Sequence, residues 1–163
     1  MSVSLTSSGL AMPASQSASG DANTLDDYEE GTYAPSLTGT SGAPSGVGFH
    51  TRSGLYTIIG KMINVMIHVN LASWSSGPAG NIYVSLPSNV NSSYSCANPI
   101  GYMANWSKYP TGSICSADSD RMYLYTRDAG SSVAPTMGTG ITNIVAADML
   151  ATSEIYAGAT YAR

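Results

Sequence analysis

Apolar side chains occupy every second position of residues 61–71. One set of alternate positions holds Ile63, Val65, Ile67, Val69 and Leu71, and the other holds Met62, Asn64, Met66, His68 and Asn70. Successive side chains of a β-strand point to opposite faces, so this period of two predicts a strand with an apolar inner face. An α-helix would repeat about every 3.6 residues instead.

Shorter runs of the same kind predict further strands. Residues 54–59 precede Gly60, a glycine suited to a tight bend, and we expect them to pair with the long strand. Residues 82–86 alternate and end at Pro87, which predicts a hairpin of Lys61–Ser73 with Asn81–Leu86. Other expected strands are 32–37, 100–106, 113–115, 121–127 and 155–161, whereas 141–150 suits either a strand or a helical turn.

Segments rich in Gly, Ser, Pro and Asn separate these strands and predict turns and loops. They are residues 39–48, 77–81, 88–99 and 128–140. Seven or eight short strands joined in this way predict an all-β fold, an antiparallel β-sandwich of jelly-roll-like form, over residues 21–163. Residues 1–20 hold seven serines and too few apolar residues for a core, so we expect an extended N-terminal arm or anchor.

Composition and charge exclude several classes of protein. The chain has 163 residues, 10% of them charged, and about a third are Ser, Thr or Gly, which is unlike a coiled coil. A net charge of −4 argues against binding nucleic acid through its phosphates, and no apolar run is long enough to span a membrane. Five of the ten acidic residues fall within 21–30, where we expect a solvated or capping helical turn.

No pattern of catalytic or cofactor-binding residues emerges, so we predict no catalytic, cofactor or metal site. His50 and His68 lack a nucleophile motif, although His68 copies gathered around a symmetry axis are an alternative as metal ligands. Cys96 and Cys115 lack zinc spacing, which leaves two free thiols or one bridge. Asp118 and Asp120 suit a solvated loop better than a calcium site.

Tyrosine is strongly favoured over phenylalanine, eleven residues to one. Tyr and Trp suit interfaces and sugar contacts because they join flat apolar area to a polar edge, although packing across strands is the simpler alternative. The candidate contacts to a host-surface glycan are Tyr102, Trp106, Tyr123 and Tyr125. The candidate subunit interface is the face of the long strand opposite its apolar inner face, with Met62, Met66 and His68.

Two segments of the chain resemble a known family. Residues 13–35 contain Asp26, Asp27, Tyr28, Glu29, Glu30 and Gly31. This stretch resembles the segment P-A-x-Q-x-x-S-x-D-x-N-T-L-D-D-Y-E-E-G-T-W-T-P of tail-fibre and other virion structural proteins of tailed bacteriophages. Residues 54–63 are similar to that family's G-x-Y-T-K-I-G-N-x-V. The chain departs from the pattern at Tyr33-Ala34, Ile58 and Lys61.

The resemblance implies a non-enzymatic, trimeric β-sandwich exposed on the virion surface, after assembly in the host cytoplasm. The main interpretation is a fibre or knob that aids attachment to the host, with other copies of itself, other virion proteins (through residues 1–20) and a bacterial surface glycan as partners. The alternative is a capsid decoration protein that stabilises capsomer contacts, and a small hydrolase is the third interpretation. Because relatives carry this domain at the end of a longer fibre, whereas Met1 lies about twenty residues before it, we expect a small stand-alone subunit.

Overall fold

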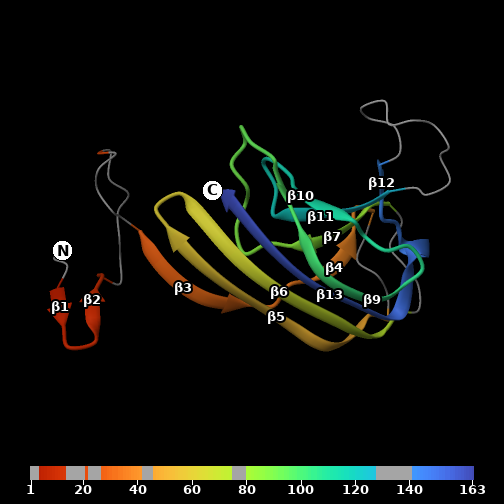
Figure 1. Cartoon of the computed structure of the whole chain (residues 1–163), viewed down its shortest axis with the longest axis horizontal. Helices are drawn as coiled ribbons and strands as arrows, with labels where there is room; N and C mark the ends of the chain where they lie inside the picture. The colour runs from red at the N-terminus through yellow and green to blue at the C-terminus, as the bar shows by residue number, and fades with distance from the viewer. Residues whose placement is uncertain (1–3, 14–20, 22–26, 42–45, 75–79, 128–140) are drawn as a thin grey trace.

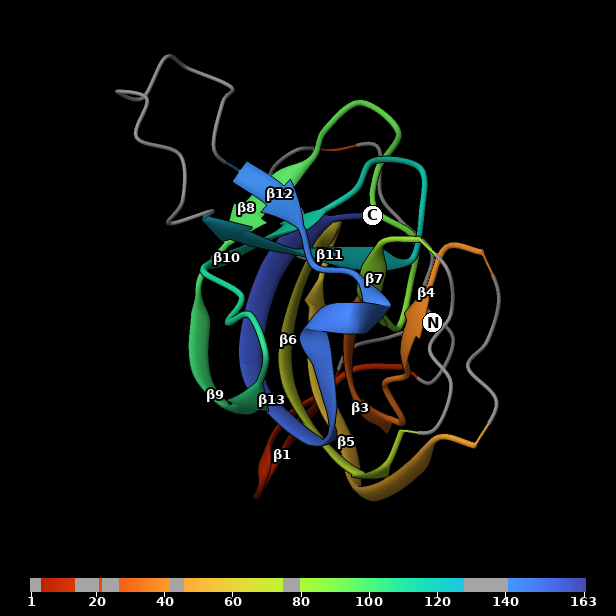
Figure 2. The same ribbon diagram turned by 90° about the vertical axis from the view of Figure 1, so that its right-hand side faces the viewer.

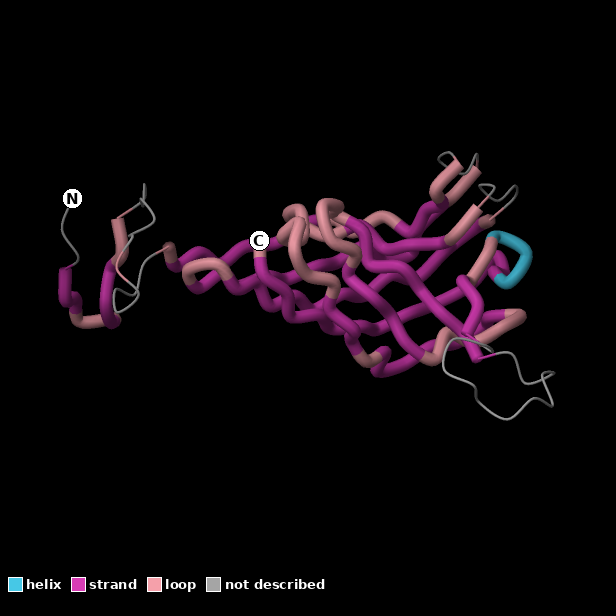
Figure 3. The backbone as a smooth tube through the Cα atoms, turned by 90° about the horizontal axis from the view of Figure 1, so that it is seen from above, coloured by secondary structure: helices cyan, strands magenta, loops and turns pink. Residues whose placement is uncertain are grey.

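The computed structural model describes residues 4–13, 21, 27–41, 46–74, 80–127 and 141–163. They form antiparallel β-sheets, as predicted (Figures 1 and 3). One sheet has the strand order β3 (Tyr28–Tyr33), β5 (Gly48–Ile59), β6 (Met62–Ser73), β13 (Met149–Ala162), β9 (Ile100–Trp106). The other has the order β4 (Leu37–Gly39), β7 (Ile82–Ser85), β11 (Arg121–Arg127), β10 (Gly112–Cys115), β8 (Cys96–Asn98).

Three small elements complete the described chain. β12 (Ile141–Asn143) pairs with the end of β11, and a 3-10 turn, η1 (Ala146–Asp148), precedes β13, which resolves the ambiguous segment 141–150. β1 (Ser4–Thr6) and β2 (Gly9–Ala11) pair with each other in a sheet of their own. The extended arm over residues 1–20, the trimer and the jelly-roll connectivity stay predictions. Within the described residues, no helix has the length and apolar character needed to cross a membrane.

The two larger sheets share one hydrophobic core, which makes the fold sandwich-like (Figure 2). The predicted inner face of β6 is confirmed, since its alternate side chains are buried against residues of the opposite sheet: Ile63, Val65, Ile67, Val69 and Leu71 from β6, and Ile82, Val84, Met122 and Leu124 from β7 and β11. Met62 and Met66, on the other set of positions, are exposed. The alternation of β6 therefore comes from one face in a core and one face in solvent.

The predicted hairpin between 61–73 and 81–86 is wrong. β6 pairs with β5 and β13, whereas β7 lies in the opposite sheet between β4 and β11. Alternation fixes which side chains of a strand are buried, but it does not say which strand lies alongside. The chain thus crosses from one sheet to the other between β6 and β7. The predicted loop 88–99 is also partly wrong, because it contains β8, a strand of three residues.

The two segments that carry the family resemblance are neighbours in the fold. β3 pairs with β5 in continuous antiparallel register, from Tyr28 opposite Ile59 to Tyr33 opposite Gly54. The expected turn is therefore wrong for Tyr28–Glu30, which is strand, and the expected strand 32–37 is divided between β3 and β4. Arg52 holds the crossing between the sheets by donating hydrogen bonds to the carbonyl oxygens of Ala34 and Pro35, both at 3.0 Å.

Two glycines in this pair of strands lie beneath tyrosine rings. Gly31 is opposite Tyr56, and Gly54 is opposite Tyr33. A Cβ atom added to either glycine would collide with the facing ring. An aromatic ring that covers a cross-strand glycine replaces the packing that the missing side chain would supply. The predicted bend at Gly60 is also confirmed, with a positive φ of 58° between β5 and β6. The predicted loop 128–140 and most of the predicted turn 77–81 lie outside the described residues.

Candidate functional site

The outer face of the five-stranded sheet carries large apolar side chains that solvent reaches. Strand register places Leu55 beside Met66 and Ile59 beside Met62, and Tyr156 lies between Tyr102 and His68. We call this surface the outer apolar face, and its members are Leu55, Ile59, Met62, Met66, Tyr102 and Tyr156, each between 42% and 64% exposed. The polar side chains of Thr57 and Asn64 lie between the Leu55–Met66 and Ile59–Met62 pairs. Large exposed apolar side chains gathered on one sheet face are typical of an interaction surface.

A row of three rings crosses this face from β9 to β6. The rings of His68 and Tyr156 stack with centroids 3.9 Å apart and an interplanar angle of 13°. Tyr102 meets Tyr156 edge-on at 5.5 Å. The Nε2 atom of His68 lies 2.9 Å from Oε1 of Glu154, so the carboxylate fixes the orientation of the imidazole. The row is a stiff platform, because each ring is held by its neighbour on the adjacent strand.

Beside the row, the face is hollowed into a shallow depression of about 390 Å³. Leu55, Met66 and Tyr156 form its sides, and Gly101 and Gly158, which lack side chains, leave space for it. Its lining is mostly apolar. A depression with these walls suits an inserted hydrophobic side chain from a protein partner.

All three residues of the predicted subunit interface lie on this sheet face. Met62 and Met66 are 48% and 64% exposed, and His68 is partly buried under its hydrogen bond to Glu154. Whether a second copy covers them stays a prediction. No group of three or more metal-ligating side chains occurs within the described part of the chain. His68 already pairs with a carboxylate, so it enters the site as a packed aromatic side chain.

The predicted glycan contacts do not gather on one surface. Tyr102 lies on the outer apolar face, whereas Tyr123 and Tyr125 project from β11 on the outside of the other sheet. Trp106 is buried, only 3% exposed, and donates its Nε1–H to the carbonyl oxygen of Glu154 at 2.8 Å. Its prediction as a surface contact is therefore wrong.

The backbone at Asn105 explains the position of Trp106. Regular alternation along β9 would place Trp106 on the same side as Tyr102, in solvent. Asn105 instead adopts a left-handed conformation with φ of 59°, next to a register shift between β9 and β13. This irregularity turns the next side chain inward, where the indole contacts the core.

Four described family-motif residues, Asp27, Tyr28, Glu29 and Glu30, make contacts within the fold. Tyr56 donates its hydroxyl to Oε1 of Glu29 at 2.6 Å, across the β3–β5 pair. Tyr28 donates to Glu30 on the same strand, and Asp27 forms an ion pair with Arg163. Asp26 lies outside the described residues. Among the described carboxylates of this segment, Glu29 thus joins β3 to β5, and Asp27 joins the start of β3 to Arg163, which follows β13.

Three side chains on the outside of the other sheet form a cluster that the sequence pattern did not predict, although Tyr123 was a candidate residue. The guanidinium of Arg121 lies over the ring of Tyr83, 4.8 Å from its centroid, and donates to the hydroxyl of Tyr123 at 3.4 Å. The rings of Tyr83 and Tyr123 are 5.8 Å apart on neighbouring strands. Tyr83 alternates with buried Ile82 and Val84, which gives its outward direction from the sequence, but the pairing of β7 with β11 was needed to join the three side chains.

Comparison with known proteins supports the fold. No protein-family model matches the chain, and no curated protein matches it in sequence. Among solved structures, the crystal structure of the Dettilon tailspike protein (gp208) superposes with a TM-score of 0.63 at 22% sequence identity. The match covers 83% of this chain and 24% of that one, so the chain spans about a quarter of the tailspike. At this level of identity the likeness shows a shared fold: an antiparallel β domain similar to part of a tailspike protein.

Proposed function

We propose that the chain is a non-enzymatic structural protein of a bacteriophage virion. In this proposal it forms a homotrimeric fibre or knob on the particle surface, where it aids attachment to the host. The sequence motif of β3 and β5 and the tailspike neighbour support the virion assignment. The outer apolar face is the observation that carries the assembly role.

Self-association through that face follows from its chemistry. Its members are Leu, Ile, Met and Tyr side chains, which lose contact with water when two such faces meet. Burial of apolar surface contributes about 25 cal/mol per Å² to association, before the entropy of binding is subtracted. A closed trimer would place three copies of the face against each other or against a neighbouring edge, which leaves the other sheet in solvent.

Sedimentation velocity on the purified full chain tests the assembly role. We expect a species of three times the 16.8 kDa chain mass, and we expect Met66→Asp to shift it to the monomer. The matched control is Tyr94→Asp, because Tyr94 is 66% exposed in the loop before β8 and does not lie on this face. A wild-type monomer, or a trimer that persists in the Met66→Asp variant, would contradict the proposal.

One observation favours the second candidate function, capsid decoration. The β1–β2 hairpin places Leu5 directly opposite Leu10, and these side chains are 85% and 59% exposed. Two adjacent leucines on an isolated hairpin suit docking onto another virion protein. Electron microscopy of particles labelled with an antibody to this chain distinguishes the two functions, because labelling over the whole head indicates decoration and labelling at the tail or at single knobs indicates the fibre role.

Three carboxylates that are engaged within the fold support a non-enzymatic role. Glu29 binds Tyr56, Glu154 binds His68, and Asp148 accepts a hydrogen bond from the backbone nitrogen of Val145 at 3.0 Å. Each of these groups has a structural partner, whereas a glycosidase needs two carboxylates that face one cleft. Incubation of the trimer with bacterial surface polysaccharide, followed by chromatography for released oligosaccharides, should give no product. Released oligosaccharides would contradict this part of the proposal.

A further inference from the structure

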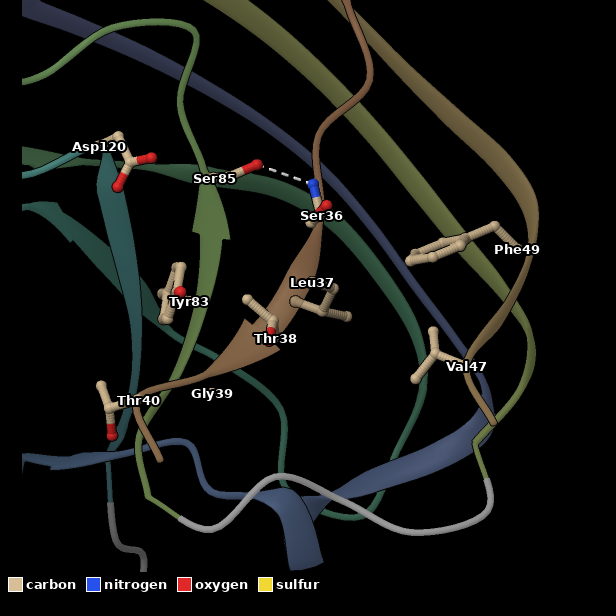
Figure 4. A pocket seen from close by; sticks show the side chains of 10 residues that line it. All are labelled: Ser36, Leu37, Thr38, Gly39, Thr40, Val47, Phe49, Tyr83, Ser85 and Asp120. Atoms are coloured by element: carbon tan, nitrogen blue, oxygen red, sulfur yellow. Dashed lines mark hydrogen bonds between the residues drawn. The ribbon is translucent and has the colours of Figure 1, made fainter. Parts of the chain in front are cut away.

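A groove runs beside β4, apart from the residues of the outer apolar face (Figure 4). Its volume is about 590 Å³, large enough for one or two sugar rings or a similar small molecule. β4 and β7 supply one wall, the start of β5 supplies another with Val47 and Phe49 near it, and Asp120 stands at the end next to β11.

Hydroxyl groups line much of this groove. Ser36, Thr38, Thr40 and Ser85 contribute them from β4, its flanks and β7. Three of these oxygens accept hydrogen bonds from the protein: Ser85 from the backbone of Ser36 at 2.8 Å, Ser36 from Arg52 at 2.9 Å, and Thr40 from the backbone of Asn81 at 3.1 Å. An oxygen fixed in this way still carries a hydroxyl hydrogen that can be donated to a ligand.

An aromatic ring and a carboxylate complete the set. Tyr83 lines the groove, and the guanidinium of Arg121 together with the ring of Tyr123 holds it in place from β11. Among the described lining residues, Asp120 is the charged one, and its side chain is exposed. The guanidiniums of Arg52, on Ser36, and of Arg121, on Tyr83, offset this negative charge, so the groove is not built for a strongly charged ligand of one sign. A single carboxylate is too few for a divalent cation.

We infer that this groove binds a neutral saccharide. The ring hydroxyls of a sugar would donate to the Asp120 carboxylate and exchange hydrogen bonds with Thr38 and Ser85, while its apolar C–H edge would pack against Tyr83. Charge-assisted bonds to a carboxylate are about twice as strong as neutral ones, which makes Asp120 the principal polar anchor. Mixed hydroxyl, aromatic and carboxylate lining is complementary to a molecule that carries both hydroxyls and apolar C–H groups.

This inference rests on the proposed function in one respect. Assembly through the outer apolar face leaves the sheet that contains β4 and β7 in solvent, so each particle would present many copies of the groove. Weak sites that act together give a much higher avidity than a single site. The saccharide site itself belongs to one chain, so it can be tested apart from assembly.

Saturation-transfer difference NMR is the test, with a panel of neutral methyl pyranosides and disaccharides, and sialic acid as the anionic comparison. We expect at least one neutral sugar to bind with a dissociation constant in the millimolar range, as is usual for a small ligand with few contacts. Asp120→Asn, an isosteric change at an exposed residue that leaves folding intact, should weaken binding by about tenfold. Tyr83→Ala should weaken it by a similar factor.

Two controls separate the outcomes. Tyr94→Ala, a change at an exposed tyrosine outside the groove, should leave binding unchanged. Monomeric Met66→Asp should still bind the sugar, so loss of the trimer and loss of the groove are distinguishable results. The inference is overturned if no neutral sugar of the panel binds at millimolar concentration, if sialic acid binds in preference, or if binding survives both groove substitutions.

Discussion

Cys96 and Cys115 lie directly opposite each other on the neighbouring strands β8 and β10. Both are free thiols, and the side-chain Nδ2 of Asn98 donates a hydrogen bond to the sulfur of Cys115 at 3.2 Å. Directly opposed residues of antiparallel strands have Cα atoms about 4.5–5.5 Å apart, which is within the range that a disulfide spans. The sequence left open whether the two cysteines are free or bridged, and this register makes both states accessible to one fold.

Oxidation of the native protein with diamide should join these two thiols within one chain. We expect the reaction to be slow, because burial and the neighbouring Cys96 raise the pKa of Cys115 to about 12 and the thiolate is the attacking form. Intact mass after treatment with iodoacetamide measures the result: the oxidised protein should lack two hydrogens and carry no alkyl group. The Cys96→Ser variant should show no such loss, and fully alkylated wild-type protein after oxidation would contradict the prediction.

Stability should fall in alkaline solution. Burial raises the pKa of Cys115 from 9.0 to about 12, and it also raises the pKa of the Tyr33 and Tyr161 hydroxyls above 10.0. A group with a raised pKa in the folded state contributes stability below its unfolded pKa and loses it as the pH rises through the folded value. We therefore expect the urea midpoint, measured under reducing conditions, to be constant up to about pH 9 and to decrease between about pH 9 and pH 12.

Variants identify which group produces this loss. Tyr161 donates its hydroxyl to the carbonyl oxygen of Ser88 at 3.1 Å, and Tyr161→Phe removes the hydroxyl while keeping the ring. Cys115→Ala removes the thiol. Both variants should show a shallower alkaline decrease than the wild type, and an equally steep decrease in the double variant would contradict the assignment.

Val65→Asp should prevent folding. Val65 is 1% exposed in the middle of β6, and a carboxylate there would face the apolar core without a partner. The cost is several kcal/mol, a large part of the about 5–15 kcal/mol by which domains of this kind are stable. Circular dichroism should show loss of the β signal, whereas Met66→Asp, one residue along the strand on the opposite face, should keep it. A folded Val65→Asp protein would overturn the register of β6.

The tyrosine rings above Gly31 and Gly54 should be energetically coupled to those glycines. Gly54→Ala places a methyl group against the ring of Tyr33, so we expect it to destabilise the fold by about 1–3 kcal/mol. In a Tyr33→Leu background the same change should cost less, because the ring is gone. Gly112→Ala, where no atom lies within 4 Å of the added Cβ, is the matched control and should be nearly neutral. Additive effects of the Gly54 and Tyr33 changes in urea unfolding would contradict the coupling.

The sequence was sufficient to predict the class of fold and which face of each main strand is buried. A strand with one buried face has apolar residues at every second position, as at Val65 and Met66. It was not sufficient for strand pairing. β6 and β7 both alternate, yet they lie in different sheets, since alternation carries no information about the partner strand. Trp106 was predicted on the wrong face for a related reason. The left-handed backbone at Asn105 reverses the alternation, and the presence of an asparagine alone does not show that its backbone is left-handed.

The candidate site could be predicted in part. Met62, Met66 and His68 share one face of one strand, so a single periodic run was enough to group them. The rings that join them, Tyr102 and Tyr156, come from strands far away in the chain, and so does the Tyr83–Arg121–Tyr123 cluster. Side chains on separate strands can be grouped only when the order of the strands in the sheet is known.

The interlocked pairs Gly31–Tyr56 and Tyr33–Gly54 also constrain how this chain can be exchanged with relatives. A genetic crossover between residues 33 and 54 keeps both pairs only if the other parent also has glycine and an aromatic residue at these positions. With a parent that lacks them, the hybrid would have an uncovered glycine or a ring that collides with a Cβ atom. Hybrids with such a parent should therefore inherit residues 28–59 as one block.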